Sequence, residues 1–177
     1  MPYLICQQVT QLDVVERVRS RYRPDMEALR RLGFRELCFY REIVFPFSLI
    51  VFFPIYLLMR SRREVLEIQR PLRISATYPL MVSEEDATCV LILGLGIKFH
   101  TNFNTGTGLI STNFQTQPID DPQRKLYKHT AILTIDEAWQ QHRGYVNQLV
   151  AAGEPVKEHI RFEDYVDLSL REEGFFH

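Results

Sequence analysis

Apolar residues in the first part of the chain follow two different periods. Residues 2–9 are rich in strand-forming side chains and end at a polar break, which predicts a short strand. Over residues 14–22 the apolar positions recur at helical spacing, with arginines on the other faces. A second short helix follows, because Asp25 is a suitable N-cap and Gly33 suits a left-handed C-terminal cap. The chain is therefore expected to open with a strand and a basic helical pair.

The next part of the chain contains seventeen consecutive residues without a charge, 43–59. As a helix, residues 44–59 would extend about 24 Å at 1.5 Å per residue, against about 30 Å for the hydrocarbon core of a bilayer. Pro46 and Pro54 each remove a backbone donor and disfavour a straight helix. The segment is therefore marginally short for a membrane span.

Three interpretations compete for residues 44–59: a kinked transmembrane helix, a re-entrant or in-plane hairpin, and two buried strands of a soluble core. Arginines flank the segment on both sides, and basic residues prefer the cytoplasmic side of a membrane. A hairpin that dips into one leaflet keeps both arginine clusters on that side, so shallow insertion is favoured. The expected membrane contacts are Phe45, Phe47, Leu49, Ile50, Phe52, Phe53, Ile55, Leu57, Leu58, Arg60, Arg62 and Arg63.

The second half of the chain begins with runs of strand-forming residues separated by polar turns. The expected strands are 73–82, 89–103 and 109–114. Gly94 and Gly96 are expected to mark a bend or bulge inside the long second strand. Asn and Gly in the NTGTG turn tolerate the positive φ that a hairpin needs. This pattern predicts a three-stranded antiparallel meander.

The last third of the chain predicts two amphipathic helices after a polar connection over residues 115–129. Thr134 and Glu137 have the T-x-x-E spacing of a capping box, which opens a helix to about Ala152. A second helix is expected from about Pro155 towards Glu173, because proline is favoured in the first helical turn.

A single domain accounts for all these elements, since 177 residues fit one hydrophobic core. The expected fold class is α+β: a small antiparallel β-meander packed with amphipathic helices, plus an apolar membrane-inserting helical segment or hairpin. Residues 1–35 form the strand and basic helical prelude. Residues 36–70 form the apolar membrane-associated segment with its basic flanks, and residues 71–177 form the meander and the two C-terminal helices.

Charge is divided unevenly along the chain. Its net value is −1, which argues against nucleic acid as a partner, because phosphate neutralisation needs a basic excess. Residues 1–73 carry 13 Lys and Arg against 8 Asp and Glu, whereas residues 74–177 carry 8 against 14. The basic part also holds the apolar segment, which indicates anionic lipid as a partner. A solvated helical face with mixed charge is the alternative explanation.

No motif in the sequence indicates catalysis or a cofactor. The glycines near residues 94–96 and 104–108 match neither a dinucleotide fingerprint nor a phosphate loop. The five histidines lack metal-ligand spacing, and no G-x-S-x-G elbow is present. Cys6, Cys38 and Cys89 lie beside large apolar residues and are expected to be buried, reduced thiols. We therefore expect no cofactor, no metal site and no catalytic residues.

Two polar features inside apolar elements are candidate contacts for a ligand or partner. Strand alternation puts Lys98, His100 and Asn102 on one face of the second strand, where they could line a pocket or face solvent. His142 lies on the buried stripe of the capped helix, where it is a candidate ligand or pH-sensitive contact, or a structural histidine.

The leading hypothesis is a non-enzymatic membrane-associated protein with the bulk of its chain on the cytoplasmic side. It would act as an accessory or structural subunit, with membrane lipid and other membrane-protein subunits as partners. One alternative is a soluble small-ligand-binding α+β domain, which requires residues 44–59 to be core. The other alternative is a cysteine or histidine hydrolase.

Overall fold

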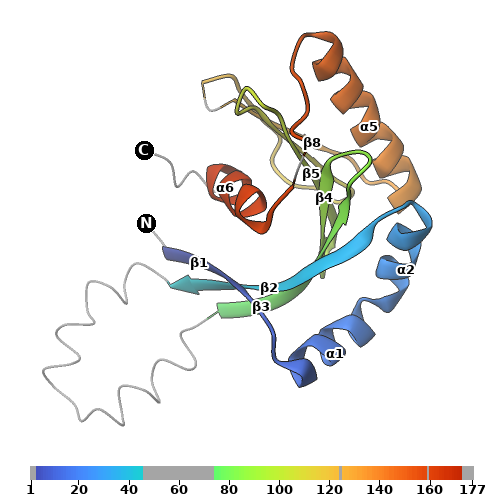
Figure 1. Ribbon diagram of the computed structural model, residues 1–177, viewed down its shortest axis with the longest axis vertical. Helices are drawn as coiled ribbons and strands as arrows, with labels where there is room; N and C mark the ends of the chain where they lie inside the picture. Colours follow the sequence, from blue (N-terminus) through green and yellow to red (C-terminus); the bar gives the residue numbers. More distant parts are fainter. Residues whose placement is uncertain (1–2, 46–73, 124, 159, 173–177) are drawn as a thin grey trace, which may run out of the picture.

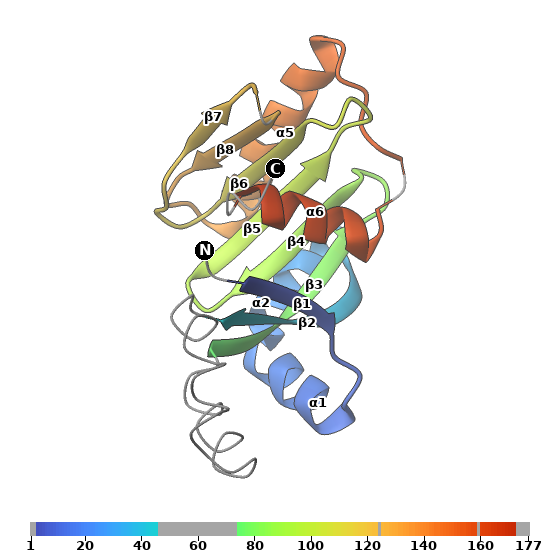
Figure 2. The ribbon, with the colours of Figure 1, turned by 90° about the vertical axis from the view of Figure 1, so that its left-hand side faces the viewer.

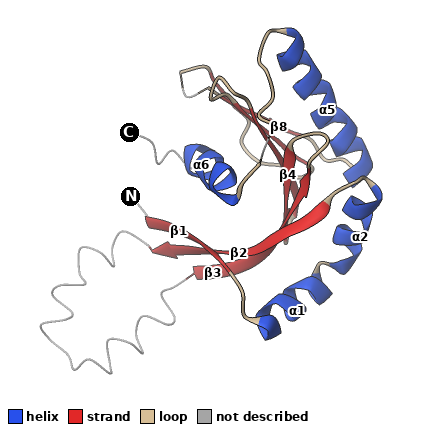
Figure 3. Cartoon of the chain, viewed as in Figure 1, coloured by secondary structure: helices blue, strands red, loops and turns tan. Residues whose placement is uncertain are grey.

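The computed structural model describes residues 3–45, 74–123, 125–158 and 160–172, which fold into an eight-stranded sheet flanked by helices (Figures 1 and 3). The strands are β1 (Tyr3–Gln8), β2 (Arg35–Phe45), β3 (Ile74–Ser83), β4 (Thr88–Leu93), β5 (Gly96–Asn102), β6 (Gly108–Thr112), β7 (Ile119–Asp121) and β8 (Leu126–Thr130). The helices are α1 (Leu12–Arg21), α2 (Arg23–Arg31), α5 (Ile135–Ala151) and α6 (Phe162–Glu172).

The strands form one mixed sheet in the order β1-β2-β3-β4-β5-β6-β8-β7. Neighbouring strands are antiparallel except for β6 and β8, which run parallel. The helices α1, α2 and α5 lie on one face of the sheet, and α6 lies on the other (Figures 1 and 2). The prediction of an α+β fold is confirmed.

Aromatic side chains fill the space between the sheet and the helices on both faces. On the α5 face, Trp139 packs edge to face against Phe34, with 4.9 Å between ring centroids. Phe99 of β5 lies 5.4 Å from the same indole. On the α6 face, Tyr40 and Tyr165 pack edge to face at 5.2 Å, and their hydroxyl oxygens lie 2.8 Å apart. Both faces of the central strands are therefore covered by packed rings.

Two helix ends form as local sequence predicts. Gly33 follows α2 with φ +91°, and the amide of Phe34 donates to the carbonyl of Leu29 at 3.0 Å, as in a Schellman cap. At the start of α5, the Thr134 hydroxyl accepts from the amide of Glu137, whose carboxylate accepts from the Thr134 amide in turn. Asp25, in contrast, lies in the first turn of α2 and is not its N-cap, because the helix begins earlier, at Arg23.

The long strand predicted over residues 89–103 is two strands. The chain reverses at Gly94 and Leu95, so that β4 and β5 pair antiparallel with Leu93 opposite Gly96. Gly96 has φ +147°, a conformation that favours glycine. Apolar residues continue on both sides of the reversal, so the hydrophobic pattern hides a two-residue turn. The predicted three-stranded meander is therefore four consecutive antiparallel strands, β3 to β6.

The region after β6 also differs from the prediction. The expected polar connection contains β7 and β8, which are short and carry charged residues, so their strand signal is weak. The last helix begins at Phe162 and not near Pro155, because the preceding segment pairs with the end of β5. The amide of Lys157 donates to the carbonyl of Asn102 at 3.0 Å, and Val156 bridges to Phe103.

The apolar segment predicted over residues 44–59 lies mostly outside the described residues. Its first two residues, Val44 and Phe45, are the last residues of β2, so they extend a strand that pairs with β1 and β3. All of residues 36–45, assigned to the membrane-associated region from sequence, therefore belong to strand β2 of the sheet. Within the described ranges, no helix is both long and apolar enough to cross a membrane.

Candidate functional site

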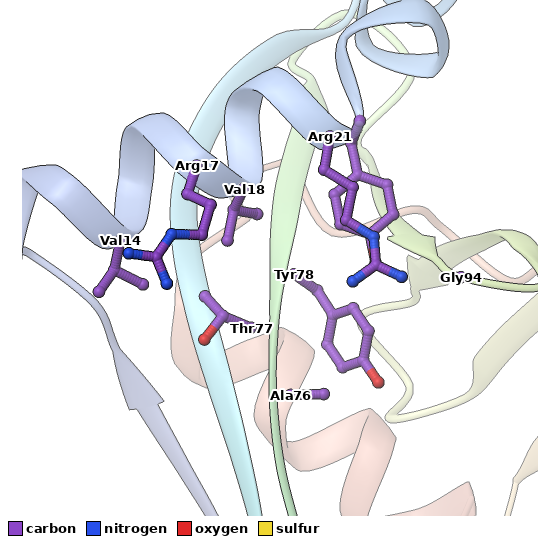
Figure 4. A pocket seen from close by; sticks show the side chains of 9 residues that line it. Val14, Arg17, Val18, Arg21, Ala76, Thr77, Tyr78 and Gly94 are labelled. Carbon is purple, nitrogen blue, oxygen red and sulfur yellow. The ribbon is translucent and has the colours of Figure 1, made fainter.

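A cavity of about 410 Å³ lies between helix α1 and strand β3, here called the α1–β3 cavity (Figure 4). Its walls are Val14, Arg17, Val18 and Arg21 of α1, the adjoining Tyr22, residues 76–78 of β3, and Gly94 in the β4–β5 turn. Small-molecule sites typically measure roughly 300–1,000 Å³, so this cavity has room for a small ligand.

The β3 side of this cavity is the part of the strand that extends past the end of its neighbour β4. Strand β3 pairs with β2 along nearly all of its length, but it pairs with β4 only over Leu80–Ser83. The earlier residues of β3 run beyond the end of β4, where the chain turns at Gly94. Ala76 and Thr77 line the cavity along this part of the strand.

Two arginines give the α1–β3 cavity a positive charge. Arg17 and Arg21 are one helical turn apart, so they share one face of α1. Figure 4 shows Arg21 pointing towards Tyr78 of β3 and the guanidinium of Arg17 turned towards Val14. Neither forms an ion pair with a described residue, and no carboxylate is among the cavity walls. Arg19, on another face of the helix, pairs with Glu16 and with Glu36. The cavity therefore combines two cationic groups with an open volume.

On the opposite face of the sheet, a buried charge cluster holds α6 against β5 and β8. The ammonium group of Lys98 donates to both carboxylate oxygens of Glu172, at 3.0 and 2.8 Å. Lys128 donates to the same carboxylate and, at 3.1 Å, to the hydroxyl of Thr116. Burial alone would raise the pKa of Glu172, but Lys98 and the other neighbouring cations lower it to about 2. Glu172 is therefore a stable anion that ties two strands to the last helix.

His100 lies in the same interface, with 2% of its surface exposed. Its ring packs edge to face against Tyr165 of α6, with 5.0 Å between centroids. Neither ring nitrogen has a hydrogen-bond partner among the described residues. Burial, followed by the positive charge of Lys98, lowers the pKa of His100 to about 3. The ring is therefore neutral near pH 7 and fills space beneath α6.

Asn102 completes the polar face that strand alternation predicts for β5. Its amide nitrogen donates to the carbonyl of Asp164 at 3.1 Å, and its amide oxygen accepts from Arg171 at 3.2 Å. Lys98, His100 and Asn102 thus share one face, as expected, and α6 covers all three. Their predicted contact with a ligand stays a prediction, and it would require α6 to move.

His142 belongs to a different network, on the α5 face. Its Nε2 lies 2.9 Å from the hydroxyl of Thr101, and its Nδ1 lies 2.9 Å from the hydroxyl of Ser111. The Thr101 hydroxyl lies 2.8 Å from that of Thr88, which donates to the carbonyl of Asp86. Since Thr88 uses its proton on Asp86, Thr101 donates to Thr88 and therefore accepts from His142 Nε2–H. Ser111 then donates to Nδ1, so His142 is a neutral ring held by two strands.

The described thiols and acidic groups offer little for catalysis. Burial raises the pKa of Cys38 to about 11, and burial also raises the pKa of Cys89, so both are protonated thiols near pH 7. Among residues 3–45, 74–123, 125–158 and 160–172, no group of three His, Cys, Asp or Glu side chains could hold a metal ion. The buried titratable groups described above all serve contacts between elements.

Sequence reasoning identified some of these residues and missed others. Of the predicted membrane contacts, Phe45 ends β2, and those from Phe47 to Arg63 lie outside the described residues. The sequence places arginines on the polar faces of the helix that becomes α1, but the position of two of them at a cavity beside β3 depends on the tertiary fold. Comparisons with protein-family models, curated proteins and solved structures find no match.

Proposed function

We propose that this chain is a non-enzymatic, membrane-associated protein of the cytoplasmic face and an accessory subunit of a larger membrane complex. The observation that carries the proposal is the position of the two chain ends that flank residues 46–73. Val44 and Ile74 are directly paired across β2 and β3. The chain therefore leaves the sheet and returns to it at the same edge, as insertion from one side of a membrane requires.

The charge and shape of the neighbouring surface support the same proposal. The α1–β3 cavity, with Arg17 and Arg21, includes Ala76, which is two residues from Ile74. Leu95 follows Gly94 of the cavity wall and is 82% exposed. Basic groups beside an exposed apolar side chain are suited to the headgroup region of an anionic membrane.

A non-enzymatic role is supported by how the chain uses its reactive side chains. His142, Lys98, Lys128 and Glu172 contact other elements through hydrogen bonds or ion pairs inside the fold. Cys38 and Cys89 have raised thiol pKa values, which weakens the alternative of a cysteine hydrolase.

Carbonate extraction of membranes that contain the full chain tests the proposal. We expect the wild type to stay in the membrane pellet and the variant Ile50→Asp with Phe53→Asp to be released. Each aspartate at the centre of an inserted segment costs about 2.5–3.5 kcal/mol. The matched control carries Leu12→Asp and Ile132→Asp, at positions that are 78% and 79% exposed in the described domain. This control is expected to stay with the membrane.

Complete release of the wild type by carbonate would contradict membrane insertion. A monodisperse wild-type protein purified without detergent would instead favour residues 44–59 as part of a soluble core. A native gel tests the accessory role separately. A subunit extracted in mild detergent should migrate within a larger assembly. Migration as the isolated chain would remove that part of the proposal.

A further inference from the structure

We infer that the α1–β3 cavity binds a phosphate group, carried either by an anionic lipid or by a small soluble phosphate ester. The lipid form of this inference rests on the proposed membrane association, whereas the soluble form does not. Three observations carry it: the pairing state of the arginines, the composition of the walls, and the position of the cavity.

The cavity arginines differ from Arg19 on the same helix, which pairs with carboxylates, whereas they resemble Arg23 and Arg31 of α2, which also form no ion pair with a described residue. Five other arginines among the described residues form ion pairs with carboxylates: Arg19, Arg30, Arg35, Arg143 and Arg171. Arg17 and Arg21 form none with a described residue, and the guanidinium of Arg21 lies 5.5 Å from the ring centroid of Tyr22. Figure 4 shows the Arg17 guanidinium turned towards Val14 and that of Arg21 towards Tyr78, so the two cations lie at different parts of the cavity wall, and an anion inside the cavity would offset their charge.

The chemistry of the walls favours phosphate. A guanidinium presents several N–H donors in a planar fork that matches two oxygens of a phosphate, and the cavity wall offers one such fork from Arg17 and one from Arg21. The hydroxyl of Thr77 is also at the cavity wall, where it accepts from Nε of Arg41 at 3.3 Å. This contact brings a third arginine close to the site and orients the Thr77 hydrogen away from Arg41.

The position of the cavity explains its proposed specificity. Its volume of about 410 Å³ exceeds the space that a bare phosphate needs, so it can admit the group to which the phosphate is attached. The apolar walls, Val14, Val18 and Ala76, suit the carbon atoms of such a group. The cavity also lies beside the first described residue after the apolar segment, Ile74, where a lipid headgroup would be within reach.

The decisive variant is Arg17→Gln with Arg21→Gln in the full chain. Its matched control, Arg23→Gln with Arg31→Gln, removes two exposed arginines of α2 that do not line the cavity. A third variant, Ala76→Leu, keeps both cavity arginines and fills part of the volume. Thermal melts of all three variants check that the fold is retained.

Two binding measurements separate the possible sources of the phosphate. Calorimetric titration of the full chain in a neutral detergent uses inorganic phosphate and glycerol 3-phosphate as soluble probes. Flotation uses phosphatidylcholine vesicles with and without phosphatidic acid. We expect the double arginine variant to lose about tenfold in affinity or more, since charge-assisted hydrogen bonds have effects of that size. Ala76→Leu should also weaken binding, because the larger side chain occupies part of the cavity. The α2 control should bind like the wild type.

Each result decides between the alternatives. Absence of binding by the wild type to every phosphate probe, equal loss in the α2 control, or unchanged binding in either cavity variant overturns the inference. Binding of soluble probes without flotation supports the cavity and its soluble ligand, and contradicts the proposed membrane association. If the wild type floats and neither cavity variant weakens flotation, the result supports membrane association and shows that the cavity is not the lipid-binding site.

Discussion

His142 and His100 are both buried, and they lie on opposite faces of the sheet. His142 is part of α5 and faces the sheet, with a hydroxyl partner at each ring nitrogen, whereas His100 is part of β5, faces α6 and has no partner among the described residues. The pKa of each is lowered to about 3, with burial as the main cause. The two rings therefore share a protonation state and differ in what holds them.

This difference extends to the two faces as a whole. The α5 face is held by neutral hydroxyl–imidazole hydrogen bonds between buried side chains. The α6 face is held by an ion cluster in which Glu172 has 6% of its side chain exposed and Lys128 has 7%. A neutral network weakens gradually when one member is lost, whereas a buried ion cluster leaves an uncompensated charge. The α6 face is therefore the more fragile of the two.

Glu172→Gln should have the largest effect, because it leaves the ammonium groups of Lys98 and Lys128 without their shared carboxylate. We expect a loss of about 3–5 kcal/mol in the free energy of unfolding, measured by urea denaturation at pH 7. The matched control Asp167→Asn removes an exposed carboxylate of the same helix that pairs only with Arg171 among the described residues. A loss below about 1 kcal/mol for Glu172→Gln would show that the cluster does not hold α6.

Acid should destabilise both faces together, starting below pH 6.5. The lowered pKa values mean that each histidine is neutral in the folded chain and gains a proton on unfolding. The stability from the neutral rings is thus complete above pH 6.5 and is lost progressively as pH falls towards 3. At pH 5 we expect a loss of about 2 kcal/mol per histidine.

Protonation of Glu172 removes stability at a lower pH than protonation of the two histidines does. Its lowered pKa means that its contribution is complete above its ordinary value of 4.5 and is lost as pH falls towards 2. Urea denaturation between pH 7 and pH 5 therefore reports mainly on the histidines. A free energy of unfolding that stays constant over this range would contradict the buried, neutral state of both rings.

Replacing each histidine by phenylalanine gives the smallest effects and the most direct comparison. His142→Phe removes the partner of Ser111 and one partner of Thr101, so we expect a loss of about 1–3 kcal/mol at pH 7. His100→Phe keeps the packing against Tyr165 and removes two unpaired polar atoms, so the free energy of unfolding should stay the same or rise. Equal losses in the two variants would contradict the difference between the faces.

The sequence predicts the local features of the fold better than its long-range pairings. The caps at Gly33 and Thr134 form as predicted, because each depends on residues within a few positions. The β4–β5 turn was missed because apolar residues continue through Gly94 and Gly96. Strand β8 was missed because its inward-facing Lys128 looks like a solvated residue until Glu172 is placed beside it.

The candidate site was predicted only in part, for the same reason. Alternation alone places Lys98, His100 and Asn102 on one face, and that arrangement is present. No periodicity in the sequence indicates that α6 covers this face, or that Arg17 and Arg21 meet β3. Those contacts join residues about 60 to 75 positions apart, and they exist only once the sheet has formed.

The paired ends of β2 and β3 also determine how the fold would carry mechanical load. A force applied to the chain between Phe45 and Ile74 pulls both strands in the same direction, along their axes. Six residue pairs join β2 to β1 and four join β3 to β4, and this pull loads those ladders in shear. Hydrogen bonds loaded in shear share the force, whereas bonds that are peeled open break one after another. The domain would therefore resist unfolding when force is applied through an attachment between Phe45 and Ile74.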